Sequence, residues 1–166
     1  MANVASAMER VLKTEGGYVN DSNDKGGETN WGITKAVAVK NGYKGSIKDM
    51  SLAFAKAVYK KQYWDVNKCD DISSQTLAEE LFDFGVNAGP PTAAKILQRL
   101  VDVKDDGNLG EMSLYAINCA ICFDLFSLQL NFALEKIKHY HRISKAPGSE
   151  NRKYIHGWLN RTYEIF

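Results

Sequence analysis

The chain has 166 residues, of which 45% are hydrophobic and 25% are charged, with a net charge of +1. This composition is typical of one compact globular domain, or of one domain with a closely packed annex, and it argues against disordered and collagen-like proteins. The small net charge argues against a protein that coats nucleic acid. Residues 125–166 nevertheless hold seven Lys and Arg against three Asp and Glu. This segment could approach an anionic polymer, although a solvated helix face is the simpler explanation of its charges.

The N-terminus lacks the basic start and the apolar core of a Sec-type signal peptide. No apolar run reaches the roughly 20 residues that a transmembrane helix needs, and polar side chains interrupt the longest apolar region, 114–134. We therefore expect a protein made in the cytoplasm, without stable membrane insertion. Three cysteines cannot all pair within the chain, which suits a reducing compartment. Two of them form Cys119-x-x-Cys122 in an apolar helical stretch, and core packing is their expected role.

Helical periodicity dominates the first half of the chain. Residues 4–15 form an amphipathic helical pattern, which Gly16-Gly17 ends. Residues 18–33 are rich in Asn, Asp and Gly and predict an ordered irregular loop with, at most, a short hairpin. Further helices are expected at about 34–41, 51–64 and 74–88.

The second half of the chain is also predicted to be helical. Thr92 follows a Gly-Pro-Pro sequence and is expected to cap a new helix. Residues 111–146 contain no Gly or Pro and predict two helices that separate near 119–124. Residues 151–163 predict a final helix. No β-branched alternation is long enough for a sheet core, so we expect a mainly α fold with at most a small β element near 18–33.

Glu15 continues the apolar stripe of the first helix, which runs through positions 4, 8 and 11. A carboxylate on a buried stripe is unusual. Partial burial and the partial negative charge of a helix C-terminus would both raise the pKa of this carboxyl group. A Glu that stays protonated near neutral pH can donate the proton that cleavage of a glycosidic bond requires. The alternative interpretation is a surface Glu just before a glycine helix stop.

The loop that follows supplies candidates for a second catalytic group, which would hold the attacking water or stabilise an oxocarbenium-like transition state. Asp24 and Thr29 are the leading candidates, and Asp21 and Glu28 rank below them. Asp and Asn are also common turn-formers, so these residues have a purely structural interpretation as well.

Aromatic and amide side chains are candidates for binding a sugar chain. Aromatic rings stack on the faces of pyranose rings, and Tyr18 and Trp31 flank the catalytic loop. Tyr63 is a further candidate. Asn87 precedes a glycine turn, where it would either hydrogen-bond an N-acetyl group or cap the end of its helix.

No metal or organic cofactor is expected. His139 and His141 are two positions apart, so they lie on different faces of a helix. No HExxH pair is present, which disfavours a zinc amidase or peptidase.

Two stretches of the first half resemble glycoside hydrolase family 108. They are E-G-G-Y-V-N-D at residues 15–21 and G-G-E-T-N-W-G-I-T at residues 26–34. That family contains N-acetylmuramidases of phage, prophage and bacterial origin. Its proposed catalytic residue is the Glu of E-G-G-Y, which corresponds to Glu15. The resemblance implies a lysozyme-like α+β fold and a muramidase that acts on peptidoglycan.

The second half is similar to the predicted peptidoglycan-binding region that usually accompanies this hydrolase. The similarity lies in L-F-D-F-G-V-N-A-G-P at residues 81–90, D-G-N-L-G at residues 106–110 and G-W-L-N-R at residues 157–161. We expect a muramidase part at 1–90 and a helical peptidoglycan-binding part at 91–166, packed together as one body.

The resemblance implies hydrolysis of the β-1,4 bond between N-acetylmuramic acid and N-acetylglucosamine, with Glu15 as the general acid. Asp24 or Thr29 would position the water. The glycan and not nucleic acid is the expected partner, and a phage or prophage endolysin or a wall-remodelling enzyme is the expected role. The enzyme would reach the periplasmic wall through a holin-type pore, an export machinery or lysis.

Two other functions fit the same residues. A lytic transglycosylase also uses one Glu, but it closes a 1,6-anhydro ring instead of adding water. A non-catalytic wall-binding or secretion accessory protein would keep the fold without the chemistry.

Overall fold

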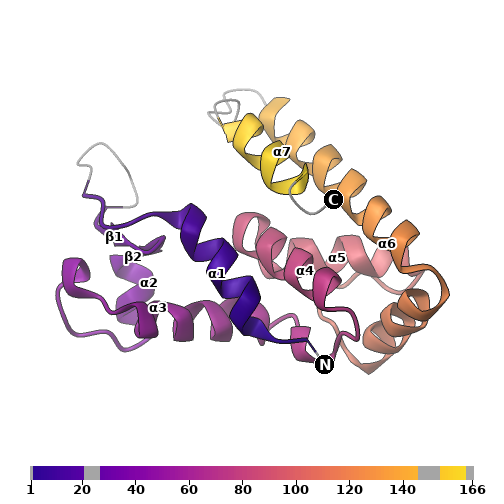
Figure 1. Ribbon diagram of the computed structural model, residues 1–166, viewed down its shortest axis with the longest axis horizontal. Helices are drawn as coiled ribbons and strands as arrows, with labels where there is room; N and C mark the ends of the chain where they lie inside the picture. The colour runs from indigo at the N-terminus through magenta and orange to yellow at the C-terminus, as the bar shows by residue number, and fades with distance from the viewer. Residues whose placement is uncertain (1, 21–26, 146–153, 164–166) are drawn as a thin grey trace.

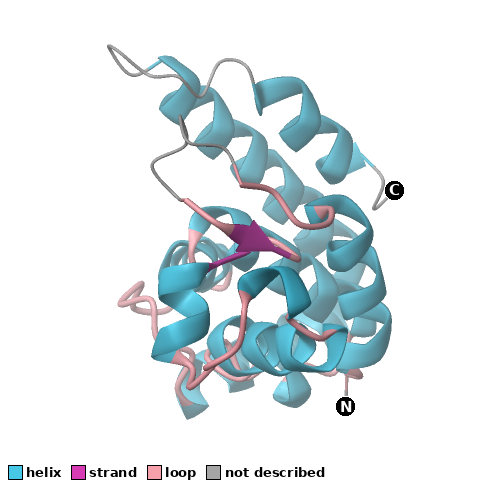
Figure 2. Cartoon of the chain, turned by 90° about the vertical axis from the view of Figure 1, so that its left-hand side faces the viewer, coloured by secondary structure: helices cyan, strands magenta, loops and turns pink. Residues whose placement is uncertain are grey.

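The computed structural model describes residues 2–20, 27–145 and 154–163, apart from the side chains of residues 13–15, 161 and 163. In these residues the fold is mainly α with one small antiparallel hairpin, which confirms the prediction (Figure 2).

The first helix, α1 (Val4–Glu15), has the predicted bounds. The side chain of Asn3 caps it by accepting a hydrogen bond from the amide of Ala5, and Met8 and Val11 are buried on its inner face. Gly16 ends the helix with a positive φ of 72°, a conformation that glycine adopts without steric cost. The apolar stripe that led to Glu15 is therefore a core-facing stripe up to Val11.

The β element is a hairpin of β1 (Thr29–Asn30) and β2 (Ile33–Thr34). Its two turn residues, Trp31 and Gly32, have φ values of 53° and 72°. Two consecutive residues with positive φ form the two-residue turn that matches the natural twist of a hairpin. The hairpin lies at the end of the predicted loop at 18–33, as the sequence allowed.

The hairpin is followed by α2 (Lys35–Lys40), the 3-10 turn η1 (Ile47–Asp49), α3 (Leu52–Tyr59), the π-helical turn η2 (Lys60–Trp64) and the 3-10 turn η3 (Cys69–Asp71). It packs against α2 and η1. Buried Asn30 fixes the hairpin, because its Nδ2 donates to the carbonyls of Ile47 at 2.8 Å and Lys48 at 3.1 Å.

The most buried helix is α4 (Gln75–Ala88), and it packs against α1 and α5 (Figure 1). The next helix, α5, spans Pro90–Leu100, so the prediction that Thr92 caps it is wrong. Gly89 precedes the first turn and Pro90 occupies the first helical position, where a missing amide proton costs nothing.

The long helix α6 (Glu111–Lys145) has a break at Asp124, where φ is −158° and ψ is 84°. The Asp124 carboxylate accepts a hydrogen bond from the amide of Ser127 at 3.0 Å and so caps the second half of the helix. The predicted separation near 119–124 is confirmed. The last described helix is α7 (Ile155–Tyr163).

The two halves of α6 differ in burial. The second half packs on α4, where the buried ring of Phe84 contacts Phe132 and Tyr140 at centroid distances of 6.0 and 5.6 Å. In the first half Cys119 and Cys122 are exposed, so the prediction of core packing for these cysteines is wrong. The helix buries the opposite face there, through Ser113 and Ile117.

By length and composition, α6 meets the criteria of a membrane span, with a mean hydropathy of 1.5 in its most apolar window. Only 22% of that window is buried.

Candidate active site

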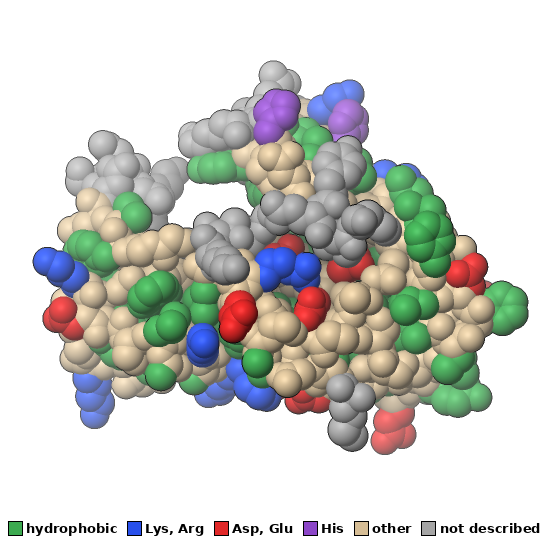
Figure 3. All heavy atoms as spheres, viewed as in Figure 1, with side chains coloured by type: hydrophobic (Ala, Val, Ile, Leu, Met, Phe, Trp, Pro, Cys, Tyr) green, Lys and Arg blue, Asp and Glu red, His purple; other side chains and the backbone are tan. Residues whose placement is uncertain are grey.

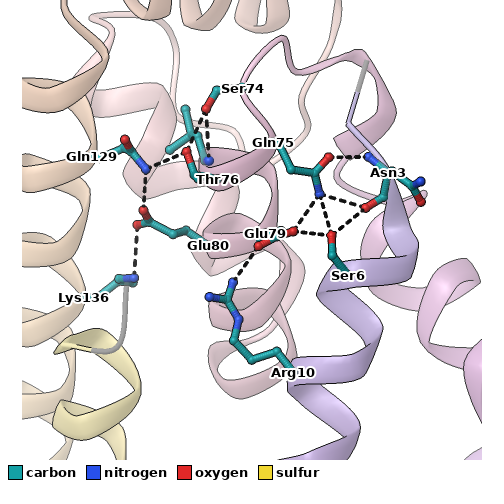
Figure 4. Close-up of polar contacts among 11 residues, drawn as sticks. Asn3, Ser6, Arg10, Ser74, Gln75, Thr76, Glu79, Glu80, Gln129 and Lys136 are labelled. Atoms are coloured by element: carbon teal, nitrogen blue, oxygen red, sulfur yellow. Dashed lines mark hydrogen bonds and ion pairs between the residues drawn. The ribbon is translucent and has the colours of Figure 1, made fainter. Parts of the chain in front are cut away.

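Helices α1 and α4 lie side by side and run in the same direction (Figure 4). The amide of Asn3 donates to Oε1 of Gln75 at 2.6 Å, and the hydroxyl of Ser6 donates to Glu79. Farther along α1, Arg10 Nη2 lies 3.2 Å from Oε2 of Glu79, so the contacts advance in the same direction along both helices.

The turn after α1 is fastened to the hairpin by side chains and by backbone. The phenolic hydroxyl of Tyr18 donates to Oε1 of Glu28 at 3.0 Å, and Lys35 Nζ lies 3.3 Å from Oε2 of the same carboxylate. The amides and carbonyls of Val19 and Thr29 exchange hydrogen bonds of 2.8 and 2.9 Å. The E-G-G-Y segment is thereby held against the hairpin.

These bonds determine the ionisation of Glu28. The hydrogen bond from Tyr18, and to a smaller extent the one from Lys35, hold the pKa of the Glu28 carboxyl below its usual value. The Tyr18–Glu28 bond also raises the pKa of the Tyr18 hydroxyl. An ionised carboxylate that accepts two hydrogen bonds is a poor proton donor. Glu28 therefore anchors the turn after α1 to the hairpin. The sequence suggested it only as a lower-ranked catalytic candidate and did not predict this anchoring role.

Three other predicted residues belong to the hairpin and its support. The hydroxyl of Thr29 donates to the carbonyl of Gly27 at 3.2 Å. The indole Nε1 of Trp31 donates to the carbonyl of Met50 at 3.0 Å, which fixes one edge of its ring. Tyr63 packs against Tyr59, with ring centroids 5.7 Å apart, and Tyr59 in turn donates to the carbonyl of Trp31 at 3.0 Å.

Asn87 lies near the end of α4, where its Nδ2 donates to the carbonyl of Asp83 at 2.9 Å. That bond matches the helix-end role considered for it, and the side chain is partly exposed. Glu15 is the last residue of α1, but its side chain lies outside the described atoms. Asp21 and Asp24 lie outside the described residues altogether.

A notch opens on the upper edge of the molecule, between the part that carries the hairpin and the arm formed by α7 and the end of α6 (Figure 3). In the same view α1 ends beneath this notch (Figure 1). On the arm, the rings of Tyr140 and Trp158 are stacked at 4.9 Å, and half-exposed Tyr154 lies 5.9 Å from Trp158.

Sequence reasoning missed Lys35 and Tyr154. Lys35 begins α2 directly after the hairpin, and only the fold shows that it turns back to Glu28. Tyr154 precedes the last helix and carries no local motif. Among the described residues, no group of three or more His, Cys, Asp or Glu is placed to hold a metal ion.

Comparison with known families places both halves of the chain. Residues 8–89 match the family described as Glycosyl hydrolase 108, and residues 92–163 match the family described as Predicted Peptidoglycan domain. The resemblance to both families inferred from the sequence motifs is confirmed, except that residues 81–89, which we attributed to the peptidoglycan-binding region, belong to the hydrolase match. No curated protein gives a significant match.

A solved structure of SagA from Brucella abortus has a similar fold. It superposes with a TM-score of 0.75 at 29% sequence identity, over 97% of this chain and 90% of that one. The mainly α, lysozyme-like fold class is consistent with this similarity.

Proposed function

We propose that this chain, whose residues 8–89 match glycosyl hydrolase family 108, is a muramidase that cleaves the β-1,4 bond between N-acetylmuramic acid and N-acetylglucosamine. The family of its first half supports a glycoside hydrolase, and that of its second half supports action on peptidoglycan. The identity of the cleaved bond, the catalytic residue and the biological role are our own proposals.

We assign the general acid to Glu15. As the last residue of α1 it lies where the unpaired carbonyls of the helix carry partial negative charge, which favours the protonated carboxyl group. Gly16 and Gly17 follow it and carry no side chain that would keep a bulky glycan away. The leaving oxygen of the glycosidic bond takes the proton from this residue.

The observation that carries the proposal is the fastening of the E-G-G-Y turn to the hairpin. Tyr18, which is 38% exposed, is held by Glu28, and Val19 pairs with Thr29. A catalytic acid accelerates a reaction only when its distance to the leaving group is fixed. The Tyr18–Glu28 bond and the Val19–Thr29 pairing supply this fixation on the C-terminal side of Glu15.

The glycan runs through the notch in this account. The ring of Tyr18 stacks on a sugar face, and Asn87, near the end of α4, hydrogen-bonds an N-acetyl group. Water attacks the anomeric carbon. Asp24 is our first candidate for the group that positions this water, and Thr29 is the second. Trp31 and Tyr63 serve to support the hairpin, because their contacts are with residues that hold it in place.

The second half of the chain would keep the enzyme on its polymer. Its family supports binding to peptidoglycan, and the arm of α6 and α7 borders the notch. We place the enzyme at the cell wall, as a phage or prophage endolysin or as a wall-remodelling hydrolase that reaches the wall by lysis, through a holin-type pore or by export.

Analysis of the reaction products tests the proposal. Purified peptidoglycan is digested with the full chain, and the soluble muropeptides are examined by mass spectrometry after borohydride reduction. We expect reduced N-acetylmuramic acid at the new ends. Anhydromuramic ends would show a lytic transglycosylase, reduced N-acetylglucosamine would show cleavage of the other bond, and no soluble product would favour a non-catalytic accessory protein.

A further inference from the structure

The first half of α6, residues 111–123, presents a continuous apolar strip to solvent. The strip consists of Met112, Tyr115, Cys119, Cys122 and Phe123, all of which are exposed. At 100° per residue these five positions fall within about 100° of the helix circumference, opposite the face that is buried in the protein. Figure 3 shows hydrophobic side chains gathered along this right-hand edge of the molecule.

The spacing within the strip is that of a helix–helix seam. Positions 112, 115, 119 and 122 alternate steps of three and four residues, which is the pattern by which one helix packs along another. Tyr115, Asn118, Cys119, Cys122 and Phe123 also line an open hollow of about 470 Å³. The same strip therefore offers projecting side chains and a hollow that receives them.

The strip is not suited to a lipid surface. Interfacial helices carry Lys and Arg beside their apolar face, yet residues 111–135 contain neither. A helix that spans a membrane needs roughly 20 continuous residues, and the break at Asp124 ends the first half of α6 well short of that. The capping carboxylate of Asp124 lies at that break.

The exposed area fits a protein interface. Within the strip, Tyr115, Phe123 and Met112 are 75%, 93% and 80% exposed. With about 150–250 Å² for each fully buried aromatic side chain, the two aromatic residues alone leave roughly 250–420 Å² of apolar surface per chain. Two copies that bury this surface against each other cover about 500–840 Å² through these residues, and Met112, Cys119 and Cys122 add to it, toward the roughly 1,200–2,000 Å² of a stable interface.

We propose that this strip is a homodimer interface, in which two copies pack antiparallel about a twofold axis near Cys119. Such an interface must be complementary to itself. Tyr115 and Phe123 lie four residues on either side of Cys119, so the axis sets Tyr115 of one copy against Phe123 of the other. The same axis brings the two Cys119 thiols together and leaves both notches free.

Sedimentation velocity of the full chain under reducing conditions tests the dimer. We expect a monomer–dimer equilibrium between low micromolar and submillimolar concentrations. Tyr115→Lys and Phe123→Lys each place two like charges in a twofold interface and should leave only monomer. Val39→Lys, at an exposed apolar position on α2, should still dimerise. A wild-type chain that remains monomeric throughout overturns the proposal.

Cross-linking tests the position of the axis. With diamide as the oxidant, we expect a disulfide-linked dimer that Cys119→Ser abolishes and Cys122→Ser preserves. Equal cross-linking in the two variants overturns the axis. Flotation with phosphatidylcholine–phosphatidylglycerol vesicles addresses the lipid alternative, and binding that Tyr115→Lys abolishes contradicts the proposal. Digestion of peptidoglycan by the Lys variants reports separately on the hydrolase function, which this interface does not require.

Discussion

The phenolic hydroxyl of Tyr18 lies 3.0 Å from Oε1 of Glu28, and this bond joins the turn after α1 to the hairpin. The other carboxylate oxygen of Glu28 faces Lys35 Nζ at 3.3 Å. Tyr18, before the loop, and Lys35, on α2, thereby both contact the carboxylate of Glu28. The orientation of the turn that follows Glu15 depends on these two contacts.

Removing the hydroxyl group of Tyr18 should slow catalysis while the fold is retained. Tyr18→Phe keeps the ring that we propose to stack on sugar and loses only the bond to Glu28, so we expect the turnover rate to fall about three- to ten-fold. Rates of reducing-end release, measured on solubilised glycan strands, report the change. Tyr43→Phe, which loses one hydrogen bond to the carbonyl of Ser46, is the matched control and should retain full activity. Equal losses in the two variants would show a general effect of losing a hydroxyl group.

The Glu28 carboxylate gives a stability term with a defined pH dependence. Its folded-state pKa is lowered, so the folded chain binds fewer protons than the unfolded chain across the window between the two values. The bonds therefore stabilise the fold fully above the ordinary Glu pKa of about 4.3 and are lost as the pH falls through the lowered value. The difference in melting temperature between wild type and Glu28→Gln should stay constant at neutral pH and shrink in acid. A difference that widens in acid contradicts this assignment.

The sequence predicted the helical course of the chain well, because the determinants of helices are local. Asn3 and Gly16 delimit α1, and the absence of Gly and Pro predicted the long helical region that breaks at Asp124. The anchoring of Glu28 was not predictable, since Lys35 reaches it only after the hairpin turns at Trp31. Sequence distance carries no information on such a contact.

The exposure of Cys119 and Cys122 could not be predicted for a different reason. An apolar stretch without Gly or Pro gives helix and hydrophobicity, but it does not say which face the rest of the fold will cover. Hydrophobic periodicity alone therefore could not predict which face of α6 is buried.

A buried ion pair between α4 and α6 should be sensitive to the loss of one partner. Lys136 Nζ lies 3.3 Å from Oε2 of Glu80, and Gln129 donates to the other oxygen at 2.8 Å (Figure 4). Burial raises the pKa of Glu80 and lowers that of Lys136, each opposed by the charge of its partner. Lys136→Met should cost about 3–5 kcal/mol of unfolding free energy, because it leaves a buried carboxylate unpaired.

The double variant Glu80→Gln/Lys136→Met removes both charges and provides the control for this prediction. It should recover most of the stability lost in Lys136→Met, since no charge is then left without a partner. Chemical denaturation of the single and double variants measures the difference. A double variant that is less stable than Lys136→Met alone contradicts the account.

Phe84 links the two family segments through its contacts with Phe132 and Tyr140. We predict that Phe84→Ala costs about 3–5 kcal/mol, as is typical of a buried aromatic side chain, and that the whole chain still unfolds in one transition. Val66→Ala, at an exposed position, should change little. Calorimetry that resolves two transitions in the wild type would show that the two segments unfold independently.

The central claim is that Glu15 is the proton donor, and the pair Glu15→Gln and Glu9→Gln tests it most directly. Both residues are on α1, and Glu9 is exposed to solvent. The rate of muropeptide release from purified peptidoglycan should fall at least about a hundred-fold in Glu15→Gln, because an amide cannot supply the proton. Glu9→Gln should match the wild type. A Glu15→Gln variant that is folded and retains the wild-type rate would contradict the account.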